Sequence, residues 1–125
     1  MRPSDEICVK DPRGIIVRLT AEQYTSHIAN DAGHPEMIKN KDAIAKTIKN
    51  PNYIFESKNS NPPTDYREVY ISFECDATYE PDMCTKVITS SGGRYAEVVT
   101  AFPAKANKYT QGTKGDALYE SKPKV

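Results

Sequence analysis

The chain has little of what would reveal its chemistry directly. It has no tryptophan, two histidines and three cysteines among 125 residues. The cysteines are Cys8, Cys75 and Cys84, an odd number without Cys-x-x-Cys spacing, so they indicate neither a thiolate zinc site nor a complete set of disulfides. Free thiols are the default expectation, and a bridge between Cys75 and Cys84 would require an oxidising compartment.

Net charge and long apolar runs are also absent. The 17 basic and 17 acidic residues cancel, so any anionic ligand must be held by a local group of cations rather than by a broadly basic surface. The longest apolar run is far too short to cross a bilayer, and no signal-peptide core follows residues 1–6. This length and composition predict one soluble domain that does not act at a membrane.

Several motifs of nucleotide and ester chemistry are missing. The chain has no G-x-x-x-x-G-K-[ST], no G-x-G-x-x-G and no G-x-S-x-G, which weighs against nucleotide triphosphate, dinucleotide and esterase functions. A metal site built from His27, His34 and Glu36 ranks last, because their spacing differs from H-E-x-x-H. We expect no metal and no cofactor.

The first half of the sequence predicts a hairpin followed by two helices. Two β-branched runs surround Asp11-Pro12-Arg13-Gly14, a typical turn sequence. Thr20 and Gln23 then fit a capping box, which predicts a helix that ends at Gly33. Pro35 suits the first position of a second helix, which Asn50-Pro51 would end.

The second half alternates with a period of two and predicts antiparallel strands at residues 52–57, 66–75, 84–91 and 94–104. In the second of these, Val69, Ile71 and Phe73 are expected to face inward and Glu68, Tyr70 and Ser72 outward. The predicted fold class is α+β, with the hairpin and two helices packed on a four- to five-stranded antiparallel sheet. Residues 1–104 would form the domain, and the Lys-rich residues 105–125 a polar tail, either disordered or wrapped around the sheet.

Several segments together resemble a known family. They are "LTAEQYTSHI", "HPEM", "DAIAKTIKNPNYIF", "VYISF" and "YAEVVTAF", which lie between Val17 and Phe102. The pattern is similar to the phage and polymorphic-toxin relatives of the barnase, EndoU, colicin and RelE ribonucleases, known as the BECR fold. The resemblance implies a bacterial, phage-related toxin that acts as a metal-independent endoribonuclease. Its partners would be RNA, with tRNA among the candidates, and a cognate immunity or antitoxin protein. It would act in the bacterial cytoplasm, or in a target cell as part of a larger toxin.

Such an enzyme needs groups that move protons. The reaction is attack of a 2′-hydroxyl on its own phosphate to give a 2′,3′-cyclic phosphate, which requires a base and an acid. His34 and His27 are the candidates, because a histidine titrates near neutral pH. Glu36 is a further candidate, as a base or as the group that orients a histidine. From the residues alone, the default interpretation is structural: His34 as a helix cap, His27 as a half-buried residue at the edge of an apolar stripe, and Glu36 as a favourable charge in the first helical turn.

The phosphate also needs donors. The resemblance implies that the Thr100 hydroxyl donates to a phosphate oxygen, although a threonine among apolar strand residues usually only packs. Arg94 and Lys105 flank the same strand, and Arg67 is a third candidate cation for RNA binding. Most such charges are simply solvated.

A function of another class is a non-catalytic protein-interaction domain of a phage or mobile-element protein that has the same fold. Zero net charge and the absence of an arginine cluster favour this alternative. The effect of replacing His34 on cleavage and on stability separates the two.

Overall fold

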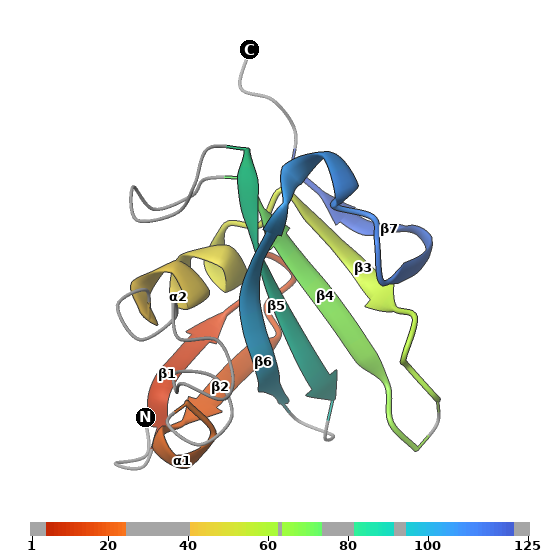
Figure 1. Cartoon of the computed structure of the whole chain (residues 1–125). Coiled ribbons are helices and arrows are strands. Elements are labelled where there is room, and N and C mark those ends of the chain that lie inside the picture. Colours follow the sequence, from red (N-terminus) through yellow and green to blue (C-terminus); the bar gives the residue numbers. More distant parts are fainter. Residues whose placement is uncertain (1–4, 25–40, 63, 74–81, 92–94, 122–125) are drawn as a thin grey trace.

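A computed structural model describes residues 5–24, 41–62, 64–73, 82–91 and 95–121. Within these ranges the chain forms one seven-stranded sheet with the order β1-β2-β6-β5-β4-β3-β7 (Figure 1). The strands are β1 (Asp5–Lys10), β2 (Ile16–Thr20), β3 (Tyr53–Ser57), β4 (Arg67–Ser72), β5 (Met83–Ser91), β6 (Ala96–Lys105) and β7 (Thr113–Glu120). The helices are α1 (Ala21–Gln23), α2 (Lys41–Lys49) and the 3₁₀ turn η3 (Ala106–Lys108).

The predicted fold class is wrong. The sheet has seven strands and is mixed, because β2 and β6 run parallel while every other pair is antiparallel. The N-terminal hairpin, which was expected to pack on the sheet, extends it through this parallel pairing. At the other edge β7 pairs with β3. The described helices are short, so the architecture is chiefly β.

Both faces of the central strands carry hydrophobic residues. One face, here called the helix face, packs against α2; its buried members include Ile44 and Ile48 of α2, Tyr70 of β4 and Val87 of β5. The opposite face, here called the open face, carries Val69, Ile71, Cys84, Ile88 and Ala104, with Phe55 beside them.

The N-terminal hairpin forms where the sequence predicts it. In its turn the Gly14 amide donates to the carbonyl of Asp11 at 2.9 Å, and Gly14 has φ of +88°, a conformation that favours glycine. The Thr20 hydroxyl accepts from the amide of Gln23 at 3.1 Å, as the capping pattern predicts. The Gln23 side chain donates instead to the carbonyl of Val99, so it joins α1 to β6.

The second predicted helix agrees with α2 over its described length. Ile44 and Ile48 are both fully buried one turn apart, and the Thr47 hydroxyl donates to the carbonyl of Ala43 at 2.7 Å. The predicted continuation of the first helix to Gly33, and the second helix's start at Pro35, lie outside the described residues. No described helix is long and apolar enough to cross a membrane.

Candidate functional site

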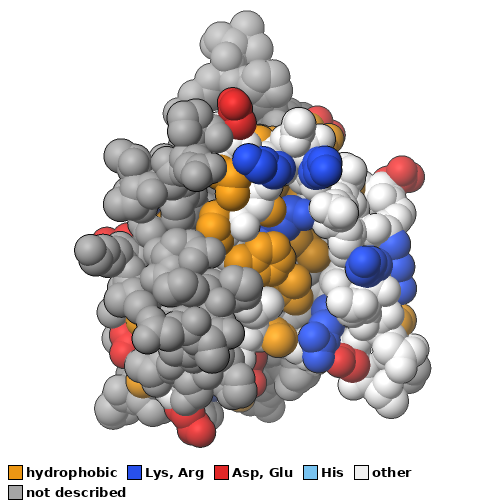
Figure 2. Space-filling model, viewed as in Figure 1, with side chains coloured by type: hydrophobic (Ala, Val, Ile, Leu, Met, Phe, Trp, Pro, Cys, Tyr) orange, Lys and Arg blue, Asp and Glu red, His pale blue; other side chains and the backbone are white. Residues whose placement is uncertain are grey.

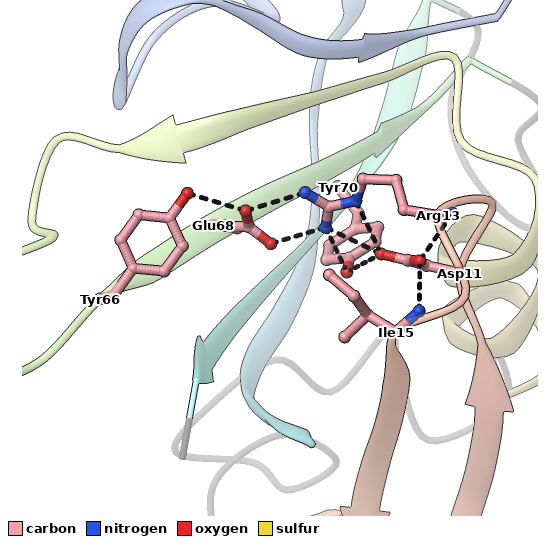
Figure 3. A network of polar contacts seen from close by, with 6 residues as sticks. All are labelled: Asp11, Arg13, Ile15, Tyr66, Glu68 and Tyr70. Carbon is pink, nitrogen blue, oxygen red and sulfur yellow. Dashed lines mark hydrogen bonds and ion pairs between the residues drawn. The ribbon is translucent and has the colours of Figure 1, made fainter. Parts of the chain in front are cut away.

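A network of polar groups, of which Asp11, Glu68 and Tyr70 are buried, joins the β1–β2 turn to β4 (Figure 3). The Arg13 guanidinium donates to both carboxylate oxygens of Glu68, at 3.0 and 2.7 Å, and its Nη2 lies 2.8 Å from Oδ2 of Asp11. The Tyr70 hydroxyl donates to Asp11 at 2.7 Å, and the Tyr66 hydroxyl donates to Glu68 at 2.8 Å. Since β1–β2 and β4 are not adjacent in the sheet, the sheet must curl for these groups to meet.

The protonation states in this network follow from burial and hydrogen bonding. Burial raises the pKa of Asp11, but hydrogen bonds from Tyr70, Arg13 and the Ile15 amide outweigh it, so the pKa lies below its ordinary value. Burial and then the bond to Asp11 raise the pKa of the Tyr70 phenol. Burial and the bond to Glu68 raise the pKa of Tyr66 to about 12. At neutral pH Asp11 is therefore ionised and both phenols are protonated.

These groups satisfy one another. Asp11 Oδ1 accepts from the amides of Arg13 and Ile15, at 2.8 and 2.9 Å, while Oδ2 accepts from Arg13 and Tyr70. Hydrogen bonding to Glu68 raises the pKa of Arg13, which keeps the guanidinium charged. Because the donors and acceptors are already paired within the fold, we assign this network to stability.

The open face differs, because it exposes apolar and cationic groups together. Figure 2 shows hydrophobic side chains in a hollow of the molecule, with Lys and Arg side chains next to it on several sides. Ile88 of β5 and its neighbours Thr100 and Phe102 of β6 are only partly buried. This is the candidate binding site.

The structure places Arg67, Thr100 and Lys105 at separate points of the sheet. Thr100 lies on the open face opposite Ile88. Arg67 of β4 pairs with Ser90 of β5, which in turn pairs with Glu97 near the start of β6. Arg67 therefore lies at the end of the sheet where β6 begins. Lys105 is exposed at the other end of β6. At about 3.3 Å per strand residue, the eight residues from Glu97 to Lys105 span roughly 26 Å. Arg67 and Lys105 therefore cannot hold the same phosphate.

The remaining predicted site residues are not placed. His27, His34, Glu36 and Arg94 lie outside the described residues. Arg67 also has a partner, because its Nε lies 2.9 Å from Oδ2 of Asp65.

Lys86 of β5 is a residue that the sequence interpretation missed. It is 4% exposed and lies on the open face, where it pairs with Ile71 of β4 and Phe102 of β6. Its Nζ donates to the carbonyl of Gln111, in the turn between η3 and β7, at 2.7 Å. Burial lowers the pKa of Lys86. The sequence did contain a signal for this position. Lys86 lies two residues from Cys84 and two from Ile88, and residues at this spacing in a strand share one face.

The tyrosines that could stack on bases mostly have partners within the protein. The ring of Tyr109 stacks on Tyr53 at 5.1 Å and meets Phe73 edge-on at 5.3 Å. The Tyr95 ring lies under the Arg18 guanidinium at 4.5 Å. The hydrogen bond with Tyr109 raises the pKa of Tyr53.

Comparisons with known proteins give no match. No family model matches the chain, and neither the curated proteins nor the solved structures include a similar one. The resemblance to the BECR ribonucleases therefore stays a prediction from the sequence. The side chains described above therefore bear on binding, and the catalytic residues rest on the sequence resemblance alone.

Proposed function

We propose that the protein binds RNA on its open face and cleaves it without a metal ion. The observation that carries the proposal is the exposure of Thr100, Ile88 and Phe102 side by side on a face that Lys and Arg side chains adjoin. RNA offers both kinds of partner that such a face accepts, because its bases stack on apolar and aromatic side chains and its phosphates attract cations.

The two described candidate cations are not equivalent. Arg67 shares its side of β4 with Val69 and Ile71 of the open face. Lys105 lies at the far end of β6, and its alternation from Thr100, Phe102 and Ala104 places it on the other side of that strand. An RNA strand that crosses the open face would therefore meet Arg67 near one end and reach Lys105 only past the end of β6. Because the net charge is zero, such binding would depend on individual cations rather than on a generally basic surface.

In the proposed reaction, histidine side chains carry out the proton transfers. His34 and His27 would exchange protons with the 2′-hydroxyl and the leaving 5′-oxygen, with Glu36 as a base or as the group that orients a histidine. The Thr100 hydroxyl would donate to the phosphate. An enzyme of this kind requires protection of its host, so an immunity or antitoxin protein is part of the proposal. The proposed place of action is the bacterial cytoplasm or that of a target cell.

Incubation with RNA in excess EDTA tests the proposal. We expect the wild-type protein to convert tRNA or a single-stranded oligonucleotide into fragments with cyclic-phosphate ends. His34→Ala and Thr100→Val should each lower the rate at least tenfold, since one general acid–base group contributes about 10²–10⁴-fold and one phosphate donor a comparable amount. The matched control is Thr64→Val, which removes an exposed loop hydroxyl that donates to the Asn61 carbonyl.

Two results contradict the proposal in different ways. RNA that is bound but stays intact with folded protein would remove the enzymatic part and favour a non-catalytic module. RNA that is neither bound nor cut would remove the proposal entirely. If His34 serves only as a cap, His34→Ala costs up to about 2 kcal/mol of stability and leaves cleavage unchanged.

A further inference from the structure

Lys86 is a buried lysine on the open face for which the described part of the chain supplies no counter-charge. It is 4% exposed, and its neighbours across the sheet, Ile71 and Phe102, are apolar. Among the described residues its ammonium has one polar partner, the Gln111 carbonyl at 2.7 Å, and it joins none of the ion pairs. An ammonium can donate three hydrogen bonds, and the described residues accept one of them.

This arrangement is unfavourable for the protein alone. Lysine is rarely buried without an ion partner, because a charge loses its hydration there without compensation. Burial accordingly lowers the pKa of Lys86, and the thiol of Cys84 is the one titratable group that opposes this effect among the described residues. An anion bound beside Lys86 would supply a counter-charge and favour the ammonium form.

Thr100 carries a hydroxyl on the same face of the sheet as Lys86, on the neighbouring strand. Lys86 pairs with Phe102, and Ile88 pairs with Thr100, so Lys86 and Thr100 are diagonal neighbours on one face of the β5–β6 ladder. Diagonal neighbours are about 7–8 Å apart between backbones, a distance that a long side chain spans. A group bound between them would meet an N–H donor and an O–H donor, with apolar walls that exclude water.

We propose that Lys86 and Thr100 form the phosphate site of the open face, with Lys86 contacting a phosphodiester oxygen. The inference deepens the proposed function and rests on it for the identity of the ligand, RNA. It also assigns to Lys86 the role of the central cation, which Arg67 and Lys105 are too far apart to share. The Gln111 carbonyl, in the turn between η3 and β7, accepts a hydrogen bond from the Lys86 ammonium and so positions it.

A substitution that removes the charge of Lys86 should stabilise the fold and weaken RNA binding. Lys86→Met keeps the length of the side chain and removes the buried charge, so we expect it to raise the melting temperature by roughly 3–8 °C. The same change should weaken binding of a single-stranded RNA at least tenfold and reduce the slope of log affinity against log salt by about 0.7. The matched control is Lys46→Met, an exposed lysine of α2 on the helix face, which should leave both quantities unchanged.

Side-chain NMR of labelled lysines provides an independent readout on the full chain. The Lys86 signal, assigned by its loss in Lys86→Met, is titrated against pH with no ligand, with inorganic phosphate and with an RNA whose 2′-hydroxyls are methylated. We expect each ligand to raise the pKa of Lys86 toward that of an exposed lysine and to leave Lys46 unaffected.

The outcomes separate this inference from the proposed function. If RNA binds equally to wild type and Lys86→Met with the same salt slope, the role of Lys86 is wrong while RNA binding stands. If RNA does not bind but phosphate raises the pKa of Lys86, the anion site stands and RNA is the wrong ligand. If neither ligand affects Lys86 and RNA does not bind, both proposals are overturned.

Discussion

Glu68→Gln is expected to lower the free energy of unfolding by about 2–4 kcal/mol, because it removes one partner of a buried ion pair. Glu68 is 4% exposed and accepts both hydrogen bonds of the Arg13 fork, at 3.0 and 2.7 Å. Glutamine presents one oxygen in place of two and carries no charge, so Arg13 would keep only Asp11 as an ionic partner. The expected loss lies below that of a fully buried pair, since the Arg13 side chain is 25% exposed.

The matched control is Glu56→Gln on the adjacent strand. Glu56 and Glu68 are directly opposite each other across β3 and β4, but Glu56 lies 3.4 Å from the ammonium of Lys114 in a more exposed pair. Exposed pairs contribute about 0–1 kcal/mol, so this variant should unfold nearly as the wild type does. Urea unfolding of both variants measures the difference. Equal effects would contradict the role assigned to the buried network.

The second large effect is expected for Ile44→Ala in α2, at about 2–5 kcal/mol. Ile44 is fully buried among the hydrophobic residues of the helix face, which include Tyr70 of β4 and Val87 of β5. Removing three carbons there leaves a cavity between helix and sheet that rigid strands cannot close. The loss should appear as a lower urea midpoint with an unchanged slope.

The same substitution at Ile16 is its control. Ile16 begins β2 and is 38% exposed, so truncation removes little buried surface and should cost less than about 1 kcal/mol. If Ile44→Ala were no more destabilising than Ile16→Ala, α2 would not pack on the sheet as described.

Local signals in the sequence predicted the local structure well. The Asp11–Gly14 turn and the Thr20 cap depend on neighbouring residues, and each lies where the pattern indicated. The pattern failed for β4, where Glu68, Tyr70 and Ser72 were expected to face outward. All three are buried, because the β1–β2 turn covers Glu68 and Tyr70 and the helix face lies on that side.

The pairing of strands that are distant in the chain could not be predicted from the sequence. The parallel contact of β2 with β6 leaves no local signature, since it depends on how the whole sheet curls. Residues 106–121, expected to form part of a polar tail, contain η3 and β7. Strand β7 lies at the edge of the sheet without a fully buried residue, so its hydrophobic pattern is weak even though both of its ends pair with β3.

The candidate site could be predicted only in part. Thr100 was a candidate only through the family resemblance; the structure places it, partly buried, on the open face, and its role stays a prediction. Lys86 was missed, because a charged residue in a strand is normally taken to face water. Its burial depends on the η3–β7 turn, whose Gln111 carbonyl covers the ammonium and which comes from the far end of the chain.

The most direct test of the central claim is to map RNA binding by NMR. Backbone and methyl signals of the full chain would be followed as an RNA with methylated 2′-hydroxyls, which cannot be cleaved by 2′-hydroxyl attack, is added. We predict that the largest changes fall on Ile88, Thr100 and Phe102 of the open face. Changes confined to α2 and β1 on the helix face, or no changes at saturating RNA, would contradict the claim that the open face binds RNA.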